Sequence, residues 1–123
     1  MIRRLVPLEH DIQAAFFQWV KLAEKANPTL RLMFAVPNAG KRSYKTAAMM
    51  IAEGLRKGVP DMILPVPRNG FTGLAIEFKR PGETPRPEQL AYIDLLVKEH
   101  WLVVVMTDSE AAIKTVKSYL GLM

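Results

Sequence analysis

The chain has 123 residues, half of them apolar and 24% charged, which is the size and composition of one globular domain rather than of a disordered or fibrous chain. Lysine and arginine outnumber aspartate and glutamate by 17 to 12, and the resulting net charge of +5 suits a phosphate-rich partner, although charge alone also fits a basic protein without one. There is no cysteine, which excludes a disulfide framework, a thiolate zinc site and a cysteine nucleophile.

Neither a membrane span nor a leader is expected from the sequence. No apolar stretch approaches the ~20 residues needed to cross a bilayer. The opening MIRRLVPLEHD contains two arginines but no apolar run after them, so it does not have the pattern of a signal peptide. These features are compatible with a cytoplasmic protein.

The first third of the chain predicts a helix and a short strand. Apolar residues recur at helical spacing from Glu9 to Lys25, and Asn27-Pro28 ends the run. Glu9 falls on the buried stripe of this helix, an unusual place for a carboxylate. RLMFAVP, residues 31–37, then predicts a short buried strand that Pro37 and the turn-forming NAGKR stop.

A second helix is predicted from Ser43 to the glycines at positions 54 and 58, and we interpret Arg56 and Lys57 as cations at its C-terminus. DMILPV (61–66) and GLAIEFK (73–79) predict two strands of an antiparallel hairpin, because the Asn69-Gly70 pair between them is a strong turn signal.

A third helix is expected from Pro87 to His100, with Leu90, Ile93, Leu96 and Val97 on one face. LVVVM (102–106) lacks alternation, which predicts a strand covered on both faces in the middle of the sheet. Asp108 or Ser109 can cap a final helix. The predicted fold is therefore a single α/β domain over residues 1–123, with the order α-β-α-β-β-α-β-α and a mixed sheet flanked by helices.

The stretch GLAIEFK places two charges in an otherwise buried strand. Ile76 and Phe78 alternate with Glu77 and Lys79, so the charged side chains share one face of the strand. Asp61 opens the neighbouring strand directly after Pro60; alone, an Asp after Pro is often only a turn residue. On adjacent strands, the carboxylates of Asp61 and Glu77 converge on one point, the oxygen-rich setting that Mg²⁺ or Mn²⁺ prefers.

With Lys79 on the same face, such a site can hydrolyse a phosphodiester bond, because the metal activates water and the lysine offsets charge on a phosphate oxygen. A plain salt bridge between Glu77 and Lys79 is the simpler alternative. Both halves of the pattern, Pro60-Asp61 and Glu77-Phe78-Lys79, resemble the signature of the PD-(D/E)XK nucleases. The inward Glu9, VPNAGKR, AEGLRKGVPD and a glutamine in the third helix are similar to the VRR-NUC (virus-type replication-repair nuclease) group of that superfamily, over nearly the whole chain.

The resemblance implies a restriction-endonuclease-like core and a role for each matching residue. Asp61 and Glu77, with the backbone carbonyl of Phe78, are expected as ligands of Mg²⁺ or Mn²⁺, and Lys79 as the residue that positions or activates water. Glu9 is expected to complete the acidic cluster directly or through water, and Gln89 to orient the lysine or a phosphate. The residues expected to contact the substrate are Asn38, Lys41 and Arg42.

Standalone members of this group are similar to Holliday-junction resolvases, which implies a homodimer that cuts branched DNA. The sequence shows no helices beyond the compact core, which favours this assembly. Two alternatives stay open: a nucleic-acid-binding module of the same fold that does not cut, and a metal-dependent enzyme acting on another phosphoester. The intact Asp61, Glu77 and Lys79 argue against the first, and the basic loop residues Lys41 and Arg42 argue against the second.

Overall fold

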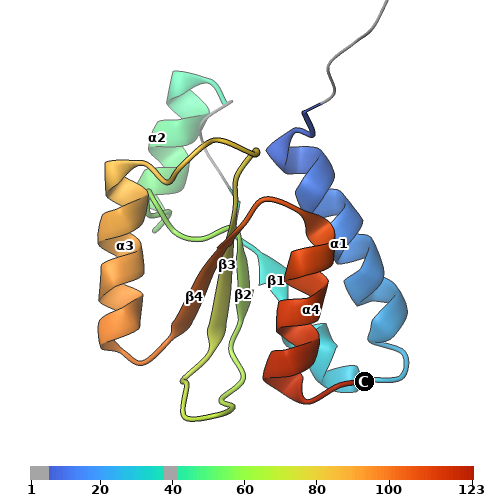
Figure 1. Ribbon diagram of the computed structural model, residues 1–123. Helices are drawn as coiled ribbons and strands as arrows, with labels where there is room; N and C mark the ends of the chain where they lie inside the picture. Colours follow the sequence, from blue (N-terminus) through green and yellow to red (C-terminus); the bar gives the residue numbers. More distant parts are fainter. Residues whose placement is uncertain (1–5, 38–41) are drawn as a thin grey trace, which may run out of the picture.

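The computed structural model describes residues 6–37 and 42–123, which form a four-stranded sheet between helices (Figure 1). In chain order its elements are α1 (Glu9–Ala23), the 3-10 helix η1 (Pro28–Leu32), β1 (Phe34–Ala35), α2 (Tyr44–Ala52), β2 (Met62–Leu64), β3 (Leu74–Phe78), α3 (Pro87–Lys98), β4 (Leu102–Met106) and α4 (Ser109–Leu120). Apart from η1, this order is the predicted one.

The sheet is mixed, with the strands in the order β1-β2-β3-β4. β2 pairs with both β1 and β3 antiparallel, whereas β3 and β4 run parallel. The predicted hairpin is confirmed, and its turn has positive φ at both Asn69 (54°) and Gly70 (83°), as a tight hairpin turn requires. The hairpin aligns the beginning of β2 with the end of β3.

The prediction that β4 lies in the middle of the sheet is wrong, because among residues 6–37 and 42–123 β4 pairs with β3 alone and forms an edge. The centre is occupied by β2 and β3, and every residue of β3 is buried. Val105 of β4 is 40% exposed. A β-branched apolar run therefore marked a strand correctly but did not reveal its place in the strand order.

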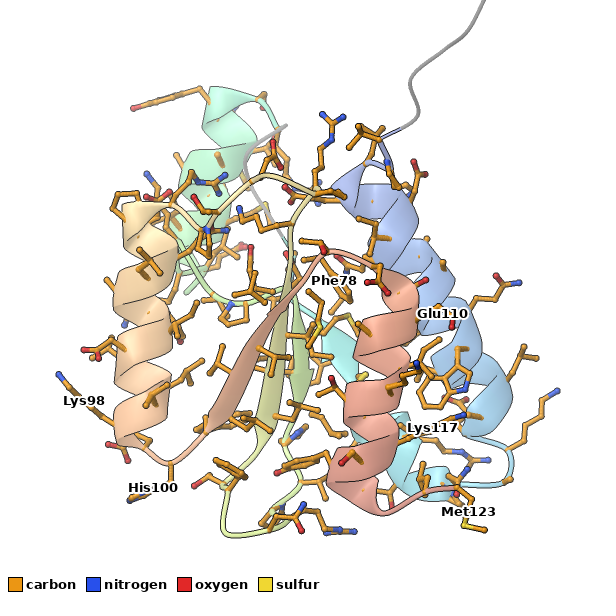
Figure 2. All side chains as sticks on the ribbon, in the orientation of Figure 1. Phe78, Lys98, His100, Glu110, Lys117 and Met123 are labelled. Carbon is orange, nitrogen blue, oxygen red and sulfur yellow. The ribbon has the colours of Figure 1, made fainter. Side chains whose placement is uncertain are left out.

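The helices form a layer on each face of the sheet. α1 packs against α4 and β3 on one face, and α3 packs against β4 on the other (Figure 1). Ile76 and Phe78 are fully buried between the sheet and the α1/α4 layer, where Figure 2 labels Phe78. The centroid of the Phe78 ring lies 5.5 Å from that of Phe16 on α1. The opposite faces of the same strands consequently point toward α3.

Two elements differ clearly from their predicted bounds. The strand expected over residues 31–37 is reduced to the exposed pair of β1, because Pro28 starts a 3-10 turn and only residues 34 and 35 pair with β2. Ser43, where this helix was predicted to begin, is its N-cap, and its side chain accepts a hydrogen bond from Thr46 N–H, but α2 ends at Ala52. Arg56 and Lys57 thus lie beyond this helix rather than at its C-terminus.

The inward face of α3 also differs from the predicted one. Leu90 and Val97 are exposed, whereas Gln89 is the buried residue of this helix. The last helix has the predicted cap, since the Asp108 side chain accepts a hydrogen bond from Ala111 N–H. Within residues 6–37 and 42–123, every helix falls short of the length and apolar character that a membrane crossing demands.

Candidate active site

The residues with predicted chemistry come together at one end of the molecule. The N-terminal ends of α1 and α3, the loop after β3, and α2 all lie at this end (Figure 1). The opposite end carries the hairpin turn and the C-terminal end of α3, where Lys98 and His100 are located (Figure 2). His100 is therefore remote from the carboxylates considered below.

Strand pairing places Asp61 across from Glu77. Met62 pairs with Ile76 in this antiparallel pair. Asp61, just before Met62, therefore faces Glu77, just after Ile76. The backbone N–H of Phe78 donates a hydrogen bond of 2.7 Å to Asp61 Oδ2. This bond fixes the Asp61 carboxylate against the end of β3, as the hairpin prediction required.

Glu77 and Lys79 point away from Ile76 and Phe78, as the alternation predicted, yet they are not on a solvated surface. Their exposed fractions are 1% and 2%. Lys79 Nζ lies 3.6 Å from Glu77 Oε2, so the simple ion pair is present. Charges are rarely buried this deeply unless they are paired or bind a ligand.

Gln89 supplies the other contact of Glu77. Its Nε2 donates a 2.7 Å hydrogen bond to Glu77 Oε2, and its Oε1 accepts one of 2.8 Å from the backbone N–H of Arg86. The side chain is 6% exposed and sits in the first turn of α3. Gln89 therefore holds the Glu77 carboxylate rather than the lysine in this structure.

The second oxygen of Glu77 meets no hydrogen-bond donor of the residues that the structure describes. Oε1 is buried and accepts no hydrogen bond from the described residues. Burial raises the pKa of Glu77 from 4.5 to about 7; the charges of Asp61 and Glu9 add to this rise, and Lys79 opposes it. A buried carboxylate with an unpaired oxygen is an incomplete arrangement.

The neighbouring carboxyl groups are perturbed in the same direction. Burial raises the pKa of Asp61, against the lowering effects of the Phe78 N–H bond and the Lys79 charge. Burial also raises the pKa of Glu9. The charge of Lys79 lowers this pKa, and the charge of Asp61 raises it further. Glu9 therefore lies close enough to interact electrostatically with Lys79 and Asp61.

This donor set fits a divalent cation. Burial raises the pKa of both carboxyl groups, Glu77 Oε1 accepts no hydrogen bond from the described residues, and such hard oxygen ligands suit Mg²⁺ or Mn²⁺. Within residues 6–37 and 42–123, however, no three His, Cys, Asp or Glu side chains are grouped so as to hold a metal. Glu9 is thus not joined with Asp61 and Glu77 in one ligand cluster, and its role through water stays a prediction.

Of the predicted substrate contacts, Asn38 and Lys41 lie outside the described residues. Arg42 is exposed just before α2. The sequence interpretation missed the importance of Arg86: its backbone anchors Gln89, and its charge acts on Asp61. Only the spacing Arg-x-x-Gln at the start of α3, which is that of a capping box, could have indicated this arrangement.

Comparisons with known proteins agree on one family. A sequence model described as the VRR-NUC domain matches residues 1–110. A solved structure titled "VRR_NUC domain protein" is similar with a TM-score of 0.79 and 26% sequence identity, covering 97% of this chain and 93% of that one. Among curated proteins, none matches the chain.

Proposed function

Since this chain belongs to the VRR-NUC domain family, which has a nuclease fold, we propose that it is a metal-dependent endonuclease that hydrolyses phosphodiester bonds in structured DNA. The observation that carries this proposal is the buried Glu77 carboxylate, whose Oε1 is unpaired beside Asp61 and Lys79. A buried carboxylate oxygen that accepts no hydrogen bond is costly to leave without a ligand, which supports a cation at this point.

Asp61, Glu77 and the backbone carbonyl of Phe78 would hold Mg²⁺ or Mn²⁺, which supplies Lewis-acid polarisation of the phosphate and a lowered pKa of water. Gln89 keeps the Glu77 carboxylate in place through its 2.7 Å bond. Lys79 contributes a fixed positive charge that orients the attacking water or stabilises charge on the phosphate oxygens.

The finer parts of the proposal concern the DNA and the assembly. Branched DNA such as a Holliday junction is the proposed substrate, contacted by Asn38, Lys41 and Arg42, and a homodimer would supply two active sites for paired cuts. The basic composition supports a nucleic-acid partner. We assign residues 1–123 to one nuclease domain acting in the cytoplasm, that of a bacterial host if a phage encodes it.

The test compares four-way junctions, flaps, duplex and single-stranded DNA, each with Mg²⁺, Mn²⁺ or EDTA. Asp61→Asn and Lys79→Met should lose at least about 100-fold in cleavage rate, since each removes one charge of the site. Asp94→Asn and Lys98→Met are matched controls, because these residues form an exposed pair on α3. Metal-independent cutting, or full activity of the two site variants, would refute the mechanism. Light scattering of the free protein tests the dimer separately.

A further inference from the structure

A cavity of about 520 Å³ opens directly beside the proposed metal ligands. It lies between α2, the segment 55–59 and the N-terminal end of α3, and both Asp61 and Gln89 line it. Its volume is in the range of small-molecule sites, about 300–1,000 Å³. The reaction proposed above uses only the carboxylate edge of this space.

The walls of the cavity are mostly apolar. Ala47, Ala48 and Ile51 line it from α2, and Leu55 and Val59 line it from the following segment. No side chain of α2 is buried, so this helix does not use its apolar face to fill the core. The apolar surface that α2 contributes is consequently available to a flat, weakly polar group.

Cations lie around the same space. Arg56, Lys57 and Arg86 all line the cavity and are exposed to solvent. Glu88 also lines it, and its Oε1 pairs with Arg86 Nε at 2.8 Å, so these two charges offset each other and Arg56 and Lys57 provide the positive charge of the rim. An occupant with an apolar body and attached negative charges complements this distribution.

The wall formed by residues 55–59 is held close to α3. Gly58 has φ of +84°, and a Cβ placed there would lie 2.3 Å from the backbone oxygen of Glu88. Only glycine allows this approach, which sets the separation between the segment and the helix that carries Gln89. The cavity is therefore built into the fold on this side.

From these observations we propose that the cavity binds one unpaired nucleobase of the DNA strand that is cut, with its phosphates between the cationic rim and the carboxylates. This proposal rests on the proposed function and deepens it. A base stacked within a duplex cannot enter, and extruding it costs a few kcal/mol, least where the base is already unpaired. The cavity thereby supplies a physical reason for a preference for flaps and junctions over plain duplex.

Two variants of the full chain test the cavity. Ala48→Trp places a large ring on the cavity side of α2, where no core residue is disturbed. Ala14→Trp is the matched control, because Ala14 is an exposed alanine of a helix and does not line the cavity. The probe is a flap DNA whose unpaired nucleotide beside the duplex is 2-aminopurine, studied in EDTA so that nothing is cut.

The fluorescence of 2-aminopurine should rise with the parent and with Ala14→Trp, since unstacking relieves its quenching, and the rise should fall at least fivefold with Ala48→Trp. The parent should also bind this flap at least tenfold tighter than a flap with an abasic site at the same nucleotide, and Ala48→Trp should bind the two equally. Equal fluorescence for both variants, or equal affinity of the parent for both flaps, would overturn the base pocket and leave phosphate contacts alone.

Cleavage assays with Mg²⁺ separate the two proposals. If the parent cuts DNA while the base makes no difference to binding, the proposed function survives and the pocket does not. If the parent cuts no DNA with metal, the proposed function is refuted, and the base pocket, which rests on it, is refuted as well.

Discussion

Replacing Glu77 by glutamine should stabilise the metal-free protein at alkaline pH while abolishing cleavage. Glutamine has the shape of the protonated acid and retains an oxygen that can accept the bond from Gln89 Nε2. It cannot take on the charge that the buried site disfavours. The expected gain in stability therefore depends on the ionisation of one side chain.

The magnitude follows from the pKa of Glu77. The difference between its ordinary value of 4.5 and a folded-state value of about 7 corresponds to about 3 kcal/mol of folding free energy. Between these two pH values the folded protein holds a proton that the unfolded chain has released. Stability from this group is therefore complete below pH 4.5 and is lost as pH rises through about 7.

The assay is urea unfolding of the parent and Glu77→Gln in EDTA, at a pH near 5 and at a pH near 8. The advantage of the variant should grow by about 2.5 kcal/mol between the two, because the unfolded chain is already mostly ionised at pH 5; this corresponds to about 10 °C in Tm for a domain of this size. The variant also removes the charged partner of Lys79. At the lower pH Glu77 is neutral in the parent as well, so Lys79 lacks that partner in both proteins and the comparison between the two pH values remains valid. With excess Mg²⁺, the parent alone should gain stability at the higher pH.

Glu53→Gln is the matched control, since Glu53 is an exposed carboxylate outside the site, and it should show no such pH dependence. If the stability difference between Glu77→Gln and the parent is the same at both pH values, the buried carboxylate is not strained and the reasoning from Oε1 fails. Cleavage by Glu77→Gln at the parental rate would refute the assignment of this residue as a metal ligand.

Three further variants test neighbouring features. Gln89→Leu removes the hydrogen-bond donor to Glu77, so the pKa of this carboxylate should rise further. The pH profile of cleavage should then move about one unit to higher pH. An unshifted profile would show that Gln89 does not act through Glu77. Gly58→Ala forces the Glu88 backbone away and should lower cleavage about tenfold by displacing Gln89, and unchanged kinetics would argue against that coupling. Gly73→Ala places a Cβ 2.5 Å from the Trp101 ring and should reduce unfolding free energy by about 1–3 kcal/mol in urea titrations, while DNA cleavage by the folded protein remains at the parental rate.

Much of the fold could be predicted because its elements have clear local signals. Helical spacing, the Asn69-Gly70 turn and the cap at Asp108 are all local, and each corresponds to an observed feature. The place of β4 was not predictable in this way, since an apolar β-branched strand can lie at the centre or at a partly covered edge. Strand order depends on contacts between distant segments, which periodicity does not report.

The candidate site shows the same division. Alternation correctly predicted that Glu77 and Lys79 oppose Ile76 and Phe78, and the hairpin correctly brought Asp61 to the end of β3. Neither pattern could show that the charged face is also covered, because the cover comes from Gln89 on a helix that follows in the chain. Arg56 and Lys57 were likewise misplaced at a helix end, since their position beside the cavity depends on where α2 stops.

The burial of both faces of β3 is unfavourable for the charged residues of the candidate site. Ile76 and Phe78 gain from burial on their face, whereas Glu77 and Lys79 lose hydration on the other and recover only a 3.6 Å ion pair and one bond from Gln89. Hydrophobic packing on one side of a single strand thus holds the carboxylate in a position that it would not adopt alone. The proposed divalent cation would supply positive charge there, so the same burial that lowers stability should increase metal affinity.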